Sequence, residues 1–119
     1  ETEIDYAFPE QSEPARMVTL AALEKQEKPD VIFCMGDLIL IGVMYAIHEK
    51  KLRIPEDIAV ISISNGLLPT LYDPKITHVE TSGYKLGKRA FIQMLSRLNG
   101  NETIEEVFID SILIEGGSL

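Results

Sequence analysis

Three polar residues stand where the sequence passes from an apolar run to a turn or a helix: Asp37, Ser64 and Asn65. Asp37 follows the run at 31–35, and Ser64 and Asn65 end the run that begins at Ile58. Both runs are apolar without alternation, which is typical of parallel strands covered on both faces. Ligands of open α/β sheets bind at the carboxyl ends of such strands. A carboxylate, a hydroxyl and an amide at this edge would hydrogen-bond a small polar ligand.

Each of these residues also has a purely structural explanation. Asp37 is a candidate amino-terminal cap for the helix that follows, where its carboxylate would accept unpaired N–H groups and meet the positive end of the helix dipole. Asn65-Gly66 is a strong turn signal. Both explanations stay open at this point, and the two roles of Asp37 can coexist if a ligand lies at that helix end.

No other residues have the pattern of a catalytic or metal site. Cys34 lies inside an apolar run, and we expect a buried core thiol there, because a reactive cysteine needs exposure and a basic neighbour. His48 and His78 do not have metal-ligand spacing with it. The chain contains no glycine-rich phosphate loop and no nucleophile elbow. We therefore predict no metal, no cofactor and no enzymatic activity, an enzyme that uses Asp37 being the least supported alternative.

The bulk composition is that of one ordinary globular domain. The chain has 119 residues, of which 45% are hydrophobic and 25% charged. A net charge of −8 argues against direct binding of this segment to a nucleic-acid backbone, which needs clustered Lys and Arg. No stretch approaches the roughly 20 apolar residues of a membrane span. A single cysteine fits a reducing compartment, and a first residue other than Met suggests that the natural amino terminus is missing.

The order of predicted elements is that of an α/β fold with a mostly parallel open sheet flanked by helices. Helices are expected from a cap at Ser12 to about 25, at 38–51, and at 84–98 after a cap at 81–83. Besides the two apolar runs, short strands are expected at 2–6, 74–79, 106–110 and 111–115, with a loop at 67–74. The helix at 38–51 is apolar almost all the way round, so part of it should meet another chain or domain.

The order and spacing of several segments resemble the carboxyl-terminal part of lactose-repressor (LacI/GalR) family regulators. The resemblance rests on Asp37 followed by Leu40-Ile41-Gly42, on 54–61, on 74–77 and on Gly87, and it covers essentially the whole chain. It implies a cytoplasmic transcription regulator with a two-lobed, periplasmic-binding-protein-like core that binds a small effector, often a carbohydrate, between its lobes. It also implies a homodimer, with DNA bound only through an amino-terminal helix-turn-helix absent from this chain, and no membrane association.

The resemblance divides the chain into one lobe, 1–80, and a return helix with closing strands, 81–119, the first lobe being absent. It places Gly36 and Ser64 where many members carry an Asn and an Asp that hydrogen-bond sugar hydroxyls, so a simple hexose does not follow as the effector. Phe8, preferred over Tyr6, lies near the position where family members place an aromatic that stacks on the ligand, and packing within the loop is the alternative. The dimer face would comprise five residues whose alternative is burial in the lobe's own core: Leu40, Met44, Ile47, Leu71 and Tyr72.

Two further expectations stay open. An extracytoplasmic solute-binding protein of the same fold is the alternative function, and an upstream helix-turn-helix or signal peptide would distinguish the two. The helix at 84–98 would normally pack on the absent lobe, so in this chain it should fold back on its own lobe or pair with another copy.

Overall fold

The computed structural model describes residue 7 and residues 11–119, so the strand expected at 2–6 and the candidates Tyr6 and Phe8 lie outside the described residues. The elements along the described chain are, in order, α1 (Ser12–Leu23), β1 (Val31–Cys34), α2 (Asp37–Glu49), β2 (Ala59–Ser64), the 3-10 helix η1 (Leu68–Leu71), β3 (Thr77–Glu80), α3 (Gly83–Leu98) and β4 (Ile112–Ile114). None of the described helices is long and apolar enough to cross a membrane.

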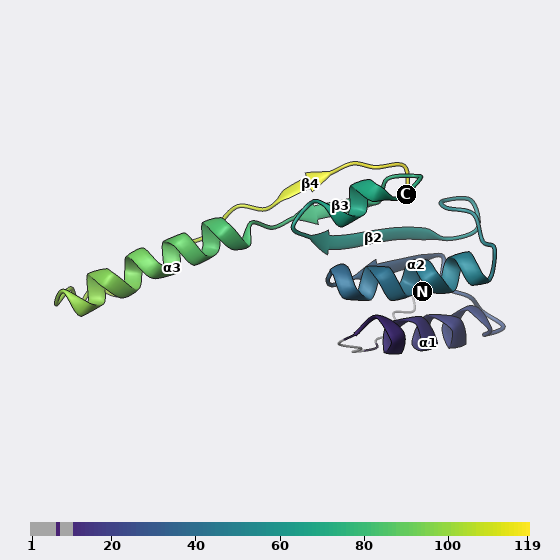
Figure 1. The fold of residues 1–119 in the computed structure, drawn as a ribbon, viewed down its shortest axis with the longest axis horizontal. Helices are drawn as coiled ribbons and strands as arrows, with labels where there is room; N and C mark the ends of the chain where they lie inside the picture. Colours follow the sequence, from purple (N-terminus) through teal and green to yellow (C-terminus); the bar gives the residue numbers. More distant parts are fainter. Residues whose placement is uncertain (1–6, 8–10) are drawn as a thin grey trace.

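The four strands form one open sheet in the order β1-β2-β3-β4 (Figure 1). β1 pairs with β2 and β2 with β3 in parallel, while β4 runs antiparallel to β3. The predicted fold class, a mostly parallel open sheet flanked by helices, is confirmed. The sequence predicts helices on both faces of the sheet. Among the described residues only one face is covered, because Val31 and Phe33 on the other face of β1 are 51% and 52% exposed.

The core of the lobe lies between the sheet and α2. Leu40, Val43 and Ile47 of α2 are at most 2% exposed and pack with strand residues such as Val60. α1 forms a further layer against α2, and Gly42 permits the close approach, because a Cβ there would lie 2.7 Å from the Cβ of Ala15. The helix that is apolar all round is therefore covered by the sheet on one side and by α1 on another.

α3 has a different environment from the other helices. Ser82 caps it as expected, its Oγ accepting from the Lys85 N–H at 3.2 Å, and the helix then projects away from the sheet (Figure 1). None of its 16 residues is buried. The radius of gyration is 17.9 Å, whereas a compact chain of this length has about 13.5 Å. Of the two alternatives expected for α3, folding back on its own lobe is wrong for the described structure, and pairing with another copy stays a prediction.

The segment after α3 returns along the helix as an extended chain. Gln93 Nε2 donates to the Glu105 carbonyl at 3.0 Å, and Arg97 Nη1 donates to the Glu102 carbonyl at 2.8 Å. The strand predicted at 106–110 is wrong, because this part of the chain runs beside the helix and pairs with no described strand. The closing strand is confirmed at Ile112–Ile114, where the chain reaches β3.

Ser118, which no sequence pattern singles out, joins the carboxyl-terminal end of the chain to the sheet. Ser118 is fully buried, its Oγ donates to the Val60 carbonyl at 2.6 Å, and it accepts from the Thr77 N–H at 2.8 Å. The Val60 N–H donates in turn to the Ser118 carbonyl at 2.9 Å. These bonds join the last residues to both β2 and β3, so the chain after α3 belongs to the same sheet as the chain before it.

Candidate functional site

The carboxyl ends of β1, β2 and β3 meet at one edge of the sheet, because these three strands are parallel. Gly36 and Asp37 follow β1, Ser64 is the last residue of β2 and Glu80 is the last residue of β3. Ser64 and Glu80 are register partners, so they lie side by side on the same face. The predicted polar segments are thus brought to one edge, which we call the ligand edge: 36–37, 64–66 and Glu80.

Asp37 is the first residue of α2, and its cap interpretation is wrong. The cap residue is Gly36, whose carbonyl accepts from the Leu40 N–H at 3.0 Å and which supplies no side chain. Asp37 Oδ1 is buried and has no hydrogen-bond partner among the described residues. A carboxylate in the first turn still lies at the positive end of the helix dipole. A Cβ at Gly36 would meet no atom of the described residues within 4 Å.

Ser64 and Asn65 have different environments. Ser64 is 4% exposed, and its Oγ accepts from the Gly66 N–H at 3.1 Å, while its carbonyl accepts from the Thr81 N–H at 2.9 Å. Gly66 has a φ of +104°, which other residues rarely adopt, so the turn reading of Asn65-Gly66 is correct. Asn65 is exposed at this turn. Ser64 therefore holds the turn in place, and the ligand role of both residues stays a prediction.

Two buried polar residues beside the ligand edge were not predicted from the sequence as site residues. Ser62 and His78 are 0% and 2% exposed and are register partners on the same face as Ser64 and Glu80. His78 Nδ1 lies 2.9 Å from the Ile76 carbonyl, which can only accept, so Nδ1 carries a proton, and in the neutral imidazole Nε2 is then an acceptor. Neither Nε2 nor the Ser62 Oγ has a partner among the described residues. The available signal was the spacing of two between polar residues, 62 and 64 in β2 and 78 and 80 in β3, which places them on one face of the sheet. The prediction of a run at 58–65 that is apolar without alternation is wrong in this respect.

An unpaired buried polar group costs about 1–3 kcal/mol of stability, so native proteins contain few of them. Three such groups occur near the ligand edge: Asp37 Oδ1, Ser62 Oγ and His78 Nε2. Two of the three are acceptors and the hydroxyl is both donor and acceptor. The edge therefore has hydrogen-bonding capacity that the described chain does not use.

The remaining reactive side chains do not form a chemical site. Cys34 is fully buried, and burial raises the pKa of its thiol to about 12, which agrees with the predicted core role. His48 is exposed late in α2. Among the described residues no group of three His, Cys, Asp or Glu side chains is placed to hold a metal ion.

The predicted dimer residues divide into two groups. Leu40 and Ile47 are 0% and 2% exposed, so they fill the lobe's own core, and their assignment to a dimer face has to be corrected. Met44 and Tyr72 are partly buried, and Leu71 is exposed. Burial raises the pKa of Tyr72, with smaller contributions from Tyr45, Cys34 and Asp37, which places Tyr72 beside α2. Dimerisation through the exposed members stays a prediction.

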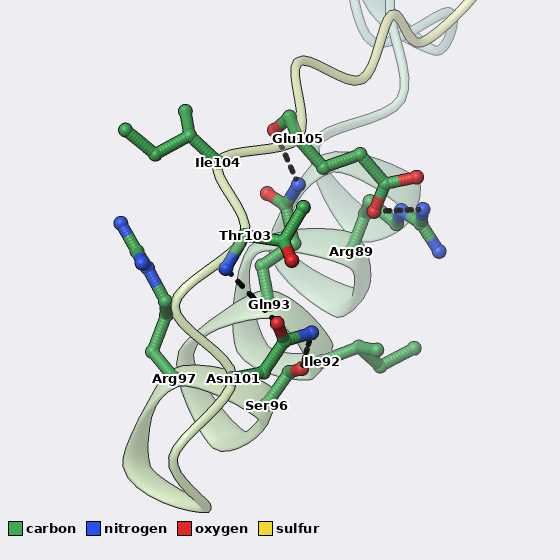
Figure 2. Close-up of a pocket in the computed structure, with 9 residues that line it drawn as sticks. All are labelled: Arg89, Ile92, Gln93, Ser96, Arg97, Asn101, Thr103, Ile104 and Glu105. Atoms are coloured by element: carbon green, nitrogen blue, oxygen red, sulfur yellow. Dashed lines mark hydrogen bonds and ion pairs between the residues drawn. The ribbon is translucent and has the colours of Figure 1, made fainter.

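A hollow of about 380 Å³ lies on α3 (Figure 2). It is formed between the helix and the extended segment at 101–105. Its polar side chains mostly satisfy one another: Asn101 Nδ2 donates to Ser96 Oγ at 3.0 Å, and Asn101 Oδ1 accepts from the Thr103 N–H at 3.0 Å (Figure 2). The hollow therefore reflects how the return segment is held on the helix, and we assign no ligand to it.

Comparison with known proteins identifies the fold family. Residues 2–119 match the family of periplasmic binding protein-like domains. The chain is 36% identical over 86 residues to the HTH-type transcriptional repressor PurR of Vibrio atlanticus, an alignment that covers 72% of this chain and 26% of that protein. The chain thus spans about a quarter of the length of this curated relative. Such relatives are transcriptional repressors and not enzymes.

Solved structures agree with the sequence relatives. A LacI transcriptional regulator of Bacillus cereus subsp. cytotoxis shares the fold with a TM-score of 0.84, at 24% identity and over 92% of this chain and 39% of that one. A LacI family regulator of Arthrobacter sp. FB24, in complex with lactose, has a TM-score of 0.76 at 26% identity, over 92% of this chain and 42% of that one. The chain therefore belongs to the periplasmic binding protein-like family, as an effector-binding domain of the LacI/GalR type.

Proposed function

We propose that this chain is the effector-sensing and dimerisation part of a LacI-type transcription regulator, which binds a small carbohydrate or carbohydrate derivative in a cleft between two lobes. The observation that carries the proposal is the ligand edge, where polar residues lie at the carboxyl ends of three parallel strands. Among the described residues, Asp37 Oδ1 at this edge and the buried Ser62 Oγ and His78 Nε2, two residues before the strand ends, have no hydrogen-bond partner. That edge is where open α/β sheets bind ligands. The lactose complex of the Arthrobacter regulator supports a carbohydrate as the ligand class.

The division of the chain follows from the same proposal. Residues 1–80 are one lobe, and 81–119 are the return helix and closing strands. The first lobe, a helix-turn-helix and the DNA contacts lie outside this chain. The exposed apolar side chains of α3, such as Phe91 and Leu95, support a role in packing on that absent first lobe. The regulator works in the cytoplasm, where its DNA is.

The proposed homodimer uses the part of α2 that neither the sheet nor α1 covers. Leu38 and Tyr45 are 55% and 64% exposed and are seven residues apart, so they lie on one helical stripe. Leu71, which is 69% exposed, is the last residue of η1, and Tyr72 follows it and packs against the core cluster that includes α2. This stripe replaces the buried Leu40 and Ile47 as the surface offered to the partner.

The mechanism would be a shift between two arrangements of the lobes. An effector that binds one arrangement more tightly increases its population, by no more than its difference in affinity allows. The spacing of the two DNA-binding heads in the dimer would follow the lobe arrangement. Operator affinity would therefore report effector binding.

The test is a thermal-shift screen of the complete gene product against mono- and oligosaccharides, sugar acids, sugar phosphates and nucleobases, followed by operator binding. A ligand at a hundredfold excess over its Kd stabilises the bound state by about 2.7 kcal/mol. We expect a stabilising carbohydrate that also changes operator affinity. Stabilisation without any DNA binding at low salt would favour the alternative, an extracytoplasmic solute-binding protein of the same fold. The upstream coding sequence separates the two as well, by a helix-turn-helix or a signal peptide.

A further inference from the structure

Glu80 bears on the chemistry of the ligand. What it indicates about that ligand rests on the proposed function. Glu80 ends β3 and is the register partner of Ser64 at the end of β2. Its carboxylate lies over the turn after β2, because a Cβ on Gly66 would be 2.7 Å from Glu80 Oε2. The side chain is only partly exposed and has no hydrogen bond or ion pair among the described residues.

The surroundings of Glu80 are rich in acceptors. The preceding register pair on the same face is the buried pair Ser62 and His78, and His78 Nε2 has no hydrogen-bond partner among the described residues. Asp37, whose Oδ1 also lacks such a partner, lies two strands away at the end of β1. Unpaired acceptors need hydrogen-bond donors, which a hydroxyl or an ammonium group supplies.

No cation of the chain neutralises this edge from the strand ends. The segments that follow the three strands, 35–37, 64–67 and 80–84, contain no Lys or Arg. The first cation after β3, Lys85, is exposed on α3. A phosphate or carboxylate placed here would face like charges without a counter-ion, which disfavours it.

We infer that Glu80 is a specificity-determining residue of the effector site, where it accepts a hydrogen bond from a hydroxyl or ammonium group of an effector that carries no negative charge at that end. Asp37, two strands away at the end of β1, supplies a second acceptor at the same edge of the sheet. Ser64 is committed to the turn, so the carboxylate at the end of β3 takes the place of a charged acceptor at the end of β2.

The test is isothermal titration of the complete gene product with four compounds on one carbon skeleton: glucose, glucosamine, gluconate and glucose 6-phosphate. We expect the wild type to bind glucose or glucosamine more tightly than either anion. Glu80→Gln, which keeps shape and removes charge, should lower affinity for the preferred ligand by about tenfold, the effect of losing one charged hydrogen bond. Glu80→Lys should reverse the ranking toward the anions.

Glu56→Lys is the matched control, because Glu56 is exposed in the turn before β2, at the opposite edge of the same sheet. It makes the same charge change and should leave the ranking unaltered, and circular dichroism checks that all variants fold. A wild type that prefers gluconate or glucose 6-phosphate would overturn the inference. Binding of a sugar with the same ranking in wild type, Glu80→Gln and Glu80→Lys would overturn it while leaving the proposed function intact. No binding by any of the four compounds would overturn the inference, while the thermal-shift screen decides the carbohydrate part of the proposed function separately.

Discussion

The lobe and α3 carry apolar residues at the same helical spacing, yet only the lobe buries them. In α2, Leu40, Val43 and Ile47 are at most 2% exposed, whereas in α3 Phe91 and Leu95 are 55% and 41% exposed. α2 has two neighbours, the sheet and α1, while α3 projects from the sheet edge with only its own return segment beside it (Figure 1). An amphipathic pattern therefore indicates which face a helix will bury, but not whether the partner lies within the same chain.

The largest expected difference between the two regions is in the stability lost when a leucine is replaced by alanine. In the 119-residue chain, Leu40→Ala should lower the free energy of unfolding by about 2–5 kcal/mol, because it leaves a cavity in the core. Leu95→Ala on α3 should change it by no more than about 0.5 kcal/mol, since its side chain is already exposed to solvent. Urea unfolding curves measure both values. Equal losses would contradict the contrast and mean that α3 packs against something in solution, for which sedimentation at several concentrations would test a second copy.

The second prediction compares thiols in the two regions. Cys34 is buried and its pKa is raised to about 12, so at pH 8 the native chain should react with Ellman's reagent at least about a thousandfold more slowly than an exposed thiol. Cys34→Ser combined with Leu98→Cys provides that exposed thiol, because residue 98 is 75% exposed on α3. Guanidinium should abolish the difference. Rapid reaction of native Cys34 would mean that the core opens readily or that β1 is not where the structure places it.

The third prediction makes one substitution in two helices. Gly42→Ala in α2 places a Cβ 2.7 Å from the Cβ of Ala15, and the overlap should cost about 1–3 kcal/mol. Gly87→Ala in α3 meets nothing within 4 Å, and the higher helix propensity of alanine should stabilise the helix by up to about 1 kcal/mol. Thermal melts with circular dichroism detect both signs. Two changes of the same sign would show that α1 and α2 do not approach as closely as described.

The smallest expected effect is a pH dependence confined to the lobe. The Arg53 guanidinium, which donates to both carboxylate oxygens of Asp57, lowers the pKa of Asp57 from 3.8 to about 2. A lowered pKa in the folded state contributes stability that is fully present above pH 3.8 and is lost as the pH falls through about 2. Asp57→Asn should remove this contribution, so wild type and variant should differ in melting temperature at pH 5 and converge at pH 2. A difference that persists at pH 2 would assign the stabilisation to another interaction.

Several features could be predicted from local pattern because their causes are local. The apolar runs became β1 and β2, Ser82 caps α3, Gly66 adopts a positive φ and Cys34 is a core thiol. The ligand edge was also predictable, because parallel strands that alternate with helices must end at the same edge. The family resemblance followed from the order of these segments.

Other features depend on contacts between residues far apart in the chain, and only the tertiary structure decided them. The sequence does not show that Leu40 and Ile47 face the core while Leu38 and Tyr45 stay exposed, because α2 is apolar on every side and its orientation depends on α1 and the sheet. Nor does the sequence show that Ser62 and His78 are register partners, or that Glu80 lies over Gly66. Strand register creates both contacts. The sequence by itself determined the fold class, the family and the edge where a ligand would bind. The three-dimensional packing determined which side chains are free to contact that ligand, because burial and register are properties of the assembled sheet and not of any one segment.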